Sequence, residues 1–168
     1  TKQSAAFPEL ADKKPCESSP AEYQQRRQTL ITALTENHIE VHSVSTDSWT
    51  GKLRELGEKK GVRNWLLGNT LDYQKAARRA LVDNDASINI TQYTQSYSTL
   101  RKTLFHDIDA SLTLAQAAIA DTGTLLLIPN QHEPRMMSLI PPIHFIKLSA
   151  KNIYSDMESL ITHLNPKD

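Results

Sequence analysis

The sequence predicts a three-layer α/β domain with a largely parallel sheet. Short apolar runs alternate along the chain with segments whose apolar residues recur at helical spacing. The connections between these segments are short, and this alternation is typical of a parallel sheet that carries helices on its faces. A chain of 168 residues favours one domain. We expect that domain over residues 19–168, after an extended leader over residues 1–18.

Composition excludes several classes of function. Nineteen basic and nineteen acidic residues give a net charge of zero, and no long basic stripe indicates nucleic-acid binding. The single cysteine, Cys16, is too few ligands for an iron–sulfur cluster held by this chain alone. No apolar run approaches the length of a membrane span. We therefore expect a cytoplasmic protein that has no membrane span and binds neither a cluster by itself nor nucleic acid.

Capping residues and apolar spacing predict the helices in the first two thirds of the chain. Ser19 can cap a helix, Pro20 suits its first position, and Glu22 completes a capping box. Gly61 is suited to end a later helix. The helices are expected over residues 20–37, from Asp47 or Ser48 to Gly61, from Thr70 onward, and over residues 98–106.

Apolar runs and alternating patterns predict the strands. The run around Trp65-Leu66-Leu67 is typical of a buried strand. A final amphipathic helix is indicated by apolar residues from Ile153 to Leu164, before Asn165-Pro166. The strands are expected over residues 39–41, 62–68, 87–91, 111–114, 124–128 and 144–148.

The candidate binding residues lie in the last third of the chain. The alanine-rich residues 115–120 predict a short helix, so Asp121-Thr122-Gly123-Thr124 should form a helix-to-strand junction. Arg135 follows a polar loop, and His144 begins the last predicted strand. Backbone amides at a tight turn, two hydroxyls and a guanidinium together predict a pocket for a small anion.

Two blocks of this region carry a family resemblance. Residues 118–125 read AIADTGTL, and residues 135–145 read RMMSLIPPIHF. They resemble the signature of the LUD domain and, more narrowly, lactate-utilisation protein C of the LutC/YkgG type. The family pattern has glutamate or a similar residue where this chain has Asp121. Its second block is matched by Arg135, Leu139, Pro141, Pro142 and His144.

The resemblance implies both a fold and a function. The fold would be the one shared by glucosamine-phosphate deaminase, ribose-phosphate isomerase and CoA-transferase domains. The function would be a part in oxidising L-lactate to pyruvate with iron–sulfur partner proteins, this chain being the cluster-free component. It would then be an accessory or small-anion-binding subunit. The resemblance marks as ligand-binding candidates Asp121, Thr122, Gly123, Thr124, Arg135 and His144.

A second function remains open, because a shared fold does not transfer chemistry. The chain could be a stand-alone enzyme that acts on a small carboxylate, phosphorylated or CoA-linked metabolite. No nucleophile–base pair is evident in the sequence, which favours the accessory role. Which residues would be catalytic is left open.

The candidate residues also have structural interpretations. Gly123 suits the end of a helix. Arg135 could be a solvated loop residue paired with Glu133, and His144 could be an ordinary residue at a strand end.

Metal and nucleotide sites are not expected. His38 and His42 are predicted on a strand, where four residues separate them by about 13 Å, too far to share one ion. Asp107 and Asp109 could be paired carboxylates or solvated loop acids. The sequence contains neither a phosphate-binding P-loop nor a Gly-x-Gly-x-x-Gly pattern.

Overall fold

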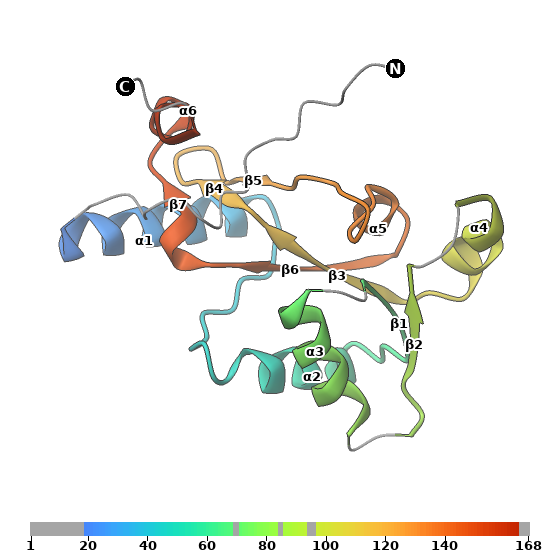
Figure 1. The fold of residues 1–168 in the computed structure, drawn as a ribbon. Helices are drawn as coiled ribbons and strands as arrows, with labels where there is room; N and C mark the ends of the chain where they lie inside the picture. Colours follow the sequence, from blue (N-terminus) through green and yellow to red (C-terminus); the bar gives the residue numbers. More distant parts are fainter. Residues whose placement is uncertain (1–18, 69–70, 84–85, 94–96, 165–168) are drawn as a thin grey trace, which may run out of the picture. The chain divides into compact units, whose positions relative to one another are not determined.

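The described chain forms two compact units (Figure 1). The computed structural model describes residues 19–68, 71–83, 86–93 and 97–164. Among the described residues, the first unit comprises 19–41, 115–128 and 148–164, and the second comprises 42–68, 71–83, 86–93, 97–114 and 129–147. The predicted leader lies outside the described residues, and the single domain over residues 19–168 stays a prediction.

A four-stranded parallel sheet forms the centre of the second unit, which confirms the predicted fold class. Its strand order is β2-β1-β3-β6. Trp65 pairs with Ile90 on one side and with Ala110 on the other, which fixes the register of the three strands. The strands are β1 (Asn64–Leu67), β2 (Asn89–Gln92), β3 (Ala110–Ala115) and β6 (Ile143–Leu148).

Helices cover both faces of this sheet. Alternate side chains of β1 point to opposite faces. Trp65 and Leu67 pack with Leu53 and Leu81, which belong to one pair of helices. Leu66 points to the other face and packs against a second pair of helices. The unit therefore has three layers (Figure 1). The first pair is α2 (Trp49–Lys59) and α3 (Asp72–Val82), and the second is α4 (Tyr97–His106) and α5 (Met136–Leu139).

The first unit has a smaller sheet between two helices. Strand β4 pairs antiparallel with β5 and parallel with β7. Ala117 and Ile119 face Leu160 of α6, whereas Ala118 packs with Leu30 of α1. The elements are α1 (Pro20–Glu36), β4 (Ala117–Ile119), β5 (Thr124–Leu126), the short 3-10 helix η2 (Ala150–Asn152), β7 (Ile153–Tyr154) and α6 (Met157–Leu164).

Two predicted helix ends are confirmed, whereas the predicted start at Thr70 and the predicted stop at Asn165-Pro166 lie outside the described residues. The Ser19 hydroxyl accepts a hydrogen bond from the Glu22 amide, and the Glu22 carboxylate accepts one from the Ser19 amide, so the capping box is complete. Gly61 follows α2 with a φ of +67°, a left-handed conformation that glycine adopts without strain.

Among the described residues, no helix is long and apolar enough to cross a membrane.

The alanine-rich helix predicted over residues 115–120 is wrong. These residues end β3 and form β4 instead. Ala117 and Ala118 have no exposed surface, and their small side chains let α1 and α6 pack against opposite faces of the strand. Burial between two layers therefore outweighs the helical preference of alanine.

Two smaller predictions are also wrong, and one short helix was not predicted. Residues 39–41 form no strand, and the Ile39 side chain is 43% exposed. Ile153 belongs to β7, so the final helix begins only at Met157. The four residues after Arg135, which were not predicted to be helical, form α5 because the Met137 side chain is fully buried there.

Candidate functional site

The six predicted ligand-binding residues divide between the two units. The stretch Asp121-Thr122-Gly123-Thr124 belongs to the first unit, whereas Arg135 and His144 belong to the second. The structure therefore describes two local environments. That both groups bind the same ligand stays a prediction.

The Thr-Gly-Thr stretch is a β-hairpin turn between β4 and β5, not the predicted helix end. Gly123 has a φ of +65°, and a Cβ at this position would lie 3.1 Å from the Cβ of Ala33 in α1. The Thr122 and Thr124 hydroxyls lie 2.9 Å apart and are exposed. Asp121 donates its amide hydrogen to the Ser155 carbonyl at 3.1 Å. Glycine is thus required by the turn and by its close approach to α1.

Arg135 is exposed at the start of α5. Its carbonyl accepts a hydrogen bond from the Ser138 hydroxyl at 2.9 Å, which holds the first turn of the helix. Within the described part of the chain no ion pair joins Arg135 to Glu133, so the pairing is wrong, whereas the exposure of Arg135 agrees with a solvated residue. The guanidinium is open to a ligand from solvent.

His144 is held inside the second unit. Its Nε2 lies 2.7 Å from the Thr113 hydroxyl. Burial lowers the pKa of the imidazole, so the neutral form dominates at pH 7. On the same stretch of β3, the Ser111 hydroxyl donates to the Met137 carbonyl at 2.6 Å. The His144–Thr113 contact joins β6 to β3, and the Ser111–Met137 bond joins α5 to β3. His144 thus makes a structural contact, as an ordinary residue at a strand end would.

The sequence did not reveal the most perturbed carboxyl group of the second unit, which belongs to Glu133. Glu133 is 6% exposed, and its Oε1 accepts a hydrogen bond from Nε2 of Gln74 at 2.9 Å. Its Oε2 lies 3.5 Å from the Leu114 amide, at the limit of a hydrogen bond. Burial raises the pKa of Glu133 to about 7, and the Leu114 amide opposes this rise. We call these two side chains the Glu133–Gln74 pair.

Local contacts set both members of the pair in place. Asn130 Oδ1 accepts hydrogen bonds from the amides of His132 and Glu133, at 2.7 and 2.9 Å. This turn directs the glutamate side chain inward from the loop of residues 129–134. Gln74 lies in the first turn of α3, and its Nε2 is also 3.2 Å from the Tyr73 hydroxyl. The only sequence signal was a polar loop, and a loop glutamate is ordinarily solvated.

Asp107 and Asp109 have different environments and do not act as paired carboxylates. Asp109 Oδ2 accepts hydrogen bonds from the Arg63 and Asn64 amides and from the Asn64 side chain, at 2.9, 2.8 and 3.2 Å. It therefore holds the amino end of β1. Asp107 is exposed. Within the described residues, no group of three or more potential metal ligands comes together.

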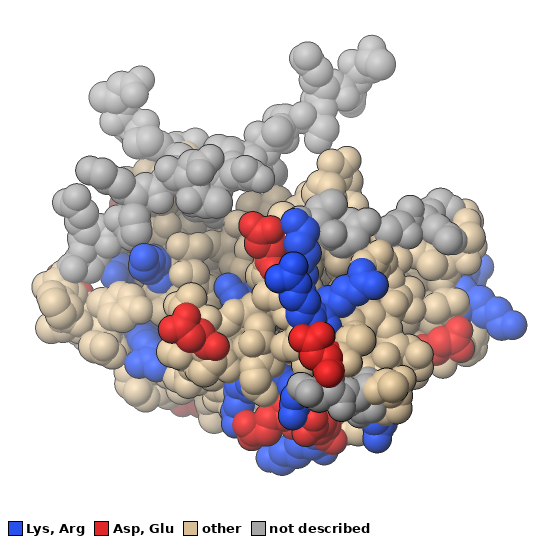
Figure 2. Space-filling view, turned by 60° about the horizontal axis from the view of Figure 1, so that its bottom comes forward, with Lys and Arg blue, Asp and Glu red and all other residues tan. Residues whose placement is uncertain are grey.

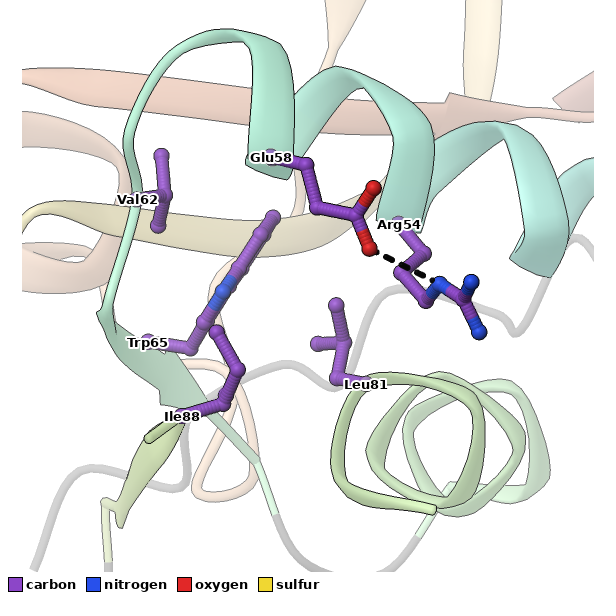
Figure 3. A pocket seen from close by; sticks show the side chains of 7 residues that line it. Arg54, Glu58, Val62, Trp65, Leu81 and Ile88 are labelled. Carbon is purple, nitrogen blue, oxygen red and sulfur yellow. Dashed lines mark hydrogen bonds and ion pairs between the residues drawn. The ribbon is translucent and has the colours of Figure 1, made fainter. Parts of the chain in front are cut away.

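A small pocket of the second unit lies beside the end of α2. Figure 3 shows Trp65 standing between Val62 on one side and Leu81 on the other. Arg54 and Glu58 form an ion pair of 3.0 Å at its rim. The Trp65 indole N–H is buried without a hydrogen-bond partner among the described residues. The lining is mostly apolar and lies away from the carboxyl ends of the strands, where α/β sheets bind ligands.

The face of the molecule shown in Figure 2 carries no basic patch on its described surface. On the face shown in Figure 2, basic and acidic side chains are interspersed over the described surface. A nucleic-acid footprint would gather basic side chains in one patch.

Comparison with known proteins decides the family. The LUD domain matches residues 27–167, which include both sequence blocks described above. The chain belongs to the LUD domain family. An uncharacterized protein of Neisseria meningitidis is 34% identical to this LUD chain over 122 residues, which are 73% of the chain. The match covers 52% of that relative, so the chain spans about half the length of the curated protein it matches.

A solved structure supports the fold of the LUD chain. It is the crystal structure of a DUF162 family protein from Deinococcus radiodurans, with a TM-score of 0.66 and 17% sequence identity. The match covers 88% of this chain and 81% of that one. At this identity the likeness concerns the fold alone.

Proposed function

We propose that this LUD domain protein is the cluster-free component of an L-lactate utilisation system, acting as an accessory or small-anion-binding subunit with iron–sulfur partner proteins. The LUD family is associated with lactate utilisation. The observation that carries the proposal is the family match over residues 27–167. The finer assignment to the LutC/YkgG type rests on the blocks AIADTGTL and RMMSLIPPIHF.

The expectation of iron–sulfur partner proteins rests on the number of cysteines in this chain. One cysteine in 168 residues cannot supply the thiolates of an iron–sulfur cluster, so the redox centres of such a system would lie on other proteins. Two groups are proposed to bind small anions, each within its own unit: the Thr-Gly-Thr turn of the first unit and Arg135 of the second. Support comes from the exposed threonine hydroxyls and from a guanidinium at the protein surface.

A spectrum and a binding experiment test this role. The isolated protein should show no visible absorption and contain no iron. It should co-purify with the iron–sulfur proteins of the same system when all are co-expressed. A chain that carries its own chromophore, or that stays separate from every such protein, would contradict the accessory role.

One observation favours the alternative of a stand-alone enzyme acting on a small carboxylate, phosphorylated or CoA-linked metabolite. Glu133 has a pKa near 7, which suits a carboxyl group that exchanges protons at neutral pH. Turnover of such a metabolite by the isolated chain, lost in Glu133→Gln, would establish the alternative in place of the accessory role.

A further inference from the structure

The Glu133–Gln74 pair lies at the position where open α/β sheets bind ligands. After β1 the chain continues into α3, which covers one face of the sheet, and reaches β2 on one side of β1. After β3, which lies on the other side of β1, the chain first forms β4 and β5 and then reaches β6 through α5, which packs on the opposite face. The connections after β1 and β3 therefore diverge. In open α/β sheets, ligands bind at the carboxyl ends of the strands at such a switch point.

Both members of the pair come from the segments that diverge there. Gln74 follows β1 at the start of α3, and Glu133 lies in the loop that leads to α5. The Leu114 amide, 3.5 Å from Glu133, belongs to the carboxyl end of β3. Gly68 directly follows β1 and, continuing the register of Leu66 with Ser111, comes level with Thr113. A Cβ atom at position 68 would lie 2.3 Å from Nε2 and Oε1 of Gln74, so only glycine leaves room for the Gln74 side chain.

One polar atom of the pair is unsatisfied. Gln74 is 1% exposed, and its Nε2 contacts both Glu133 and the Tyr73 hydroxyl. Within the described residues its Oε1 is buried and accepts no hydrogen bond. A buried amide oxygen without a donor costs about 1–3 kcal/mol. That cost is removed when a ligand supplies the donor.

We propose that the Glu133–Gln74 pair binds a hydroxyl group of a small molecule that carries no positive charge. The hydroxyl donates to Gln74 Oε1, and its oxygen accepts a hydrogen bond from the protonated Glu133 carboxyl. A hydroxyl combines one donor with acceptor lone pairs, so it matches the two groups together. The proposed anion site uses none of these residues, and this inference does not depend on it.

The charge near the pair disfavours a cationic ligand. The Lys147 ammonium lies 5.9 Å from the centre of the Tyr73 ring, whose hydroxyl contacts Gln74. It also lies 5.3 Å from the Trp49 ring, and burial lowers its pKa. A second cation beside this half-buried ammonium would be repelled. A neutral hydroxyl compound would not be repelled, nor would an anionic one at a pH where Glu133 is protonated.

The test compares acids that differ only in the hydroxyl group. L-lactate against propionate, and glycolate against acetate, are titrated into ¹⁵N-labelled protein at constant ionic strength. The side-chain amide signal of Gln74 is followed by NMR. The hydroxylated member of at least one pair should shift this signal with saturation, and the matched acid should bind at least roughly tenfold more weakly.

Three substitutions test whether Gln74 itself binds the hydroxyl group. Gln74→Met removes the unsatisfied oxygen, and binding of the hydroxylated acid, followed by calorimetry, should weaken at least roughly tenfold. Gln131→Met makes the same change at an exposed position of the loop and should leave binding unchanged. Arg135→Ala should leave the Gln74 shift intact, even where it abolishes the separate anion effect.

Two results would overturn the proposal. One is an equal response of the Gln74 signal to both members of each pair, or no response to any of the four acids. The other is unchanged binding in Gln74→Met. The NMR comparison uses the native protein, so it decides the question even where Gln74→Met fails to fold.

Discussion

The Gln74 side-chain amide donates a hydrogen bond of 2.9 Å to Glu133, a residue 59 positions further along the chain. This bond joins the first turn of α3 to the loop before α5. It also places a titratable carboxyl group in a buried position, where the neutral form is favoured. The stability of the loop is therefore linked to the protonation of one residue.

Glu133 should make the protein less stable as the pH rises from about 4.5 to about 7. Burial raises the folded-state pKa from 4.5 to about 7, so in this window the folded protein holds a proton that the unfolded chain has released. The loss amounts to at most about 3 kcal/mol at pH 8. Urea unfolding at a series of pH values measures it. Glu133→Gln should flatten this dependence, whereas Glu36→Gln on the exposed face of α1 should not.

Gly123→Ala should destabilise the protein by more than about 1 kcal/mol, and Gly123→Val by more again. The residue has a φ of +65°, and its new Cβ would lie 3.1 Å from Ala33. Two control glycines separate the causes. Gly61→Ala carries the strain of a φ of +67° without a close contact, and Gly51→Ala, in α2 with open space around it, should be neutral or stabilising. Equal losses at Gly123 and Gly61 would show that the contact with α1 is unimportant.

A small anion should raise the melting temperature through Arg135. A ligand that binds only the folded state adds about 2.7 kcal/mol at roughly a hundredfold excess over Kd. The panel is lactate, pyruvate, phosphate, a sugar phosphate and coenzyme A, at constant ionic strength. Arg135→Ala should abolish most of the shift, and Arg135→Lys should keep part of it. Arg101→Ala, on the exposed surface of α4, is the matched control. Equal shifts in all variants would indicate only a general salt effect.

Asp109→Ala should cost about 2–4 kcal/mol of stability, because it leaves the Arg63 and Asn64 amides without their acceptor. Asp107→Ala, two residues earlier and exposed, should change stability by less than about 0.5 kcal/mol. Chemical denaturation of the two variants measures the difference. Similar losses would indicate that the two acids do act as a pair.

The sequence predicted the fold better than the site. Capping residues such as Ser19 and Glu22 act over one helical turn, and the apolar run around Trp65 marks a buried strand directly. These local signals are enough to predict alternating helices and strands. Ala117 and Ala118 were misassigned because burial by two helices, distant in sequence, decides their conformation.

The Glu133–Gln74 pair could not be predicted for a related reason. Glutamate in a polar loop gives no sign of burial, and its partner lies in a different helix. The unsatisfied Gln74 oxygen appears only once the side chains are placed. Thr-Gly-Thr and Arg135, in contrast, were identified from a sequence motif. A motif does not encode how residues distant in the chain are arranged in space, so it does not decide whether the two groups bind the same ligand.

Lactate-dependent reduction of an artificial electron acceptor tests the proposed function most directly. Three samples are compared: the purified chain, the iron–sulfur partner proteins without it, and all components together. The proposal predicts no reduction by the chain alone and the fastest reduction by the complete set, with a clear loss when the chain is omitted. Reduction of the acceptor by the purified chain alone, or an equal rate with and without it, would contradict a role as the cluster-free component of lactate oxidation.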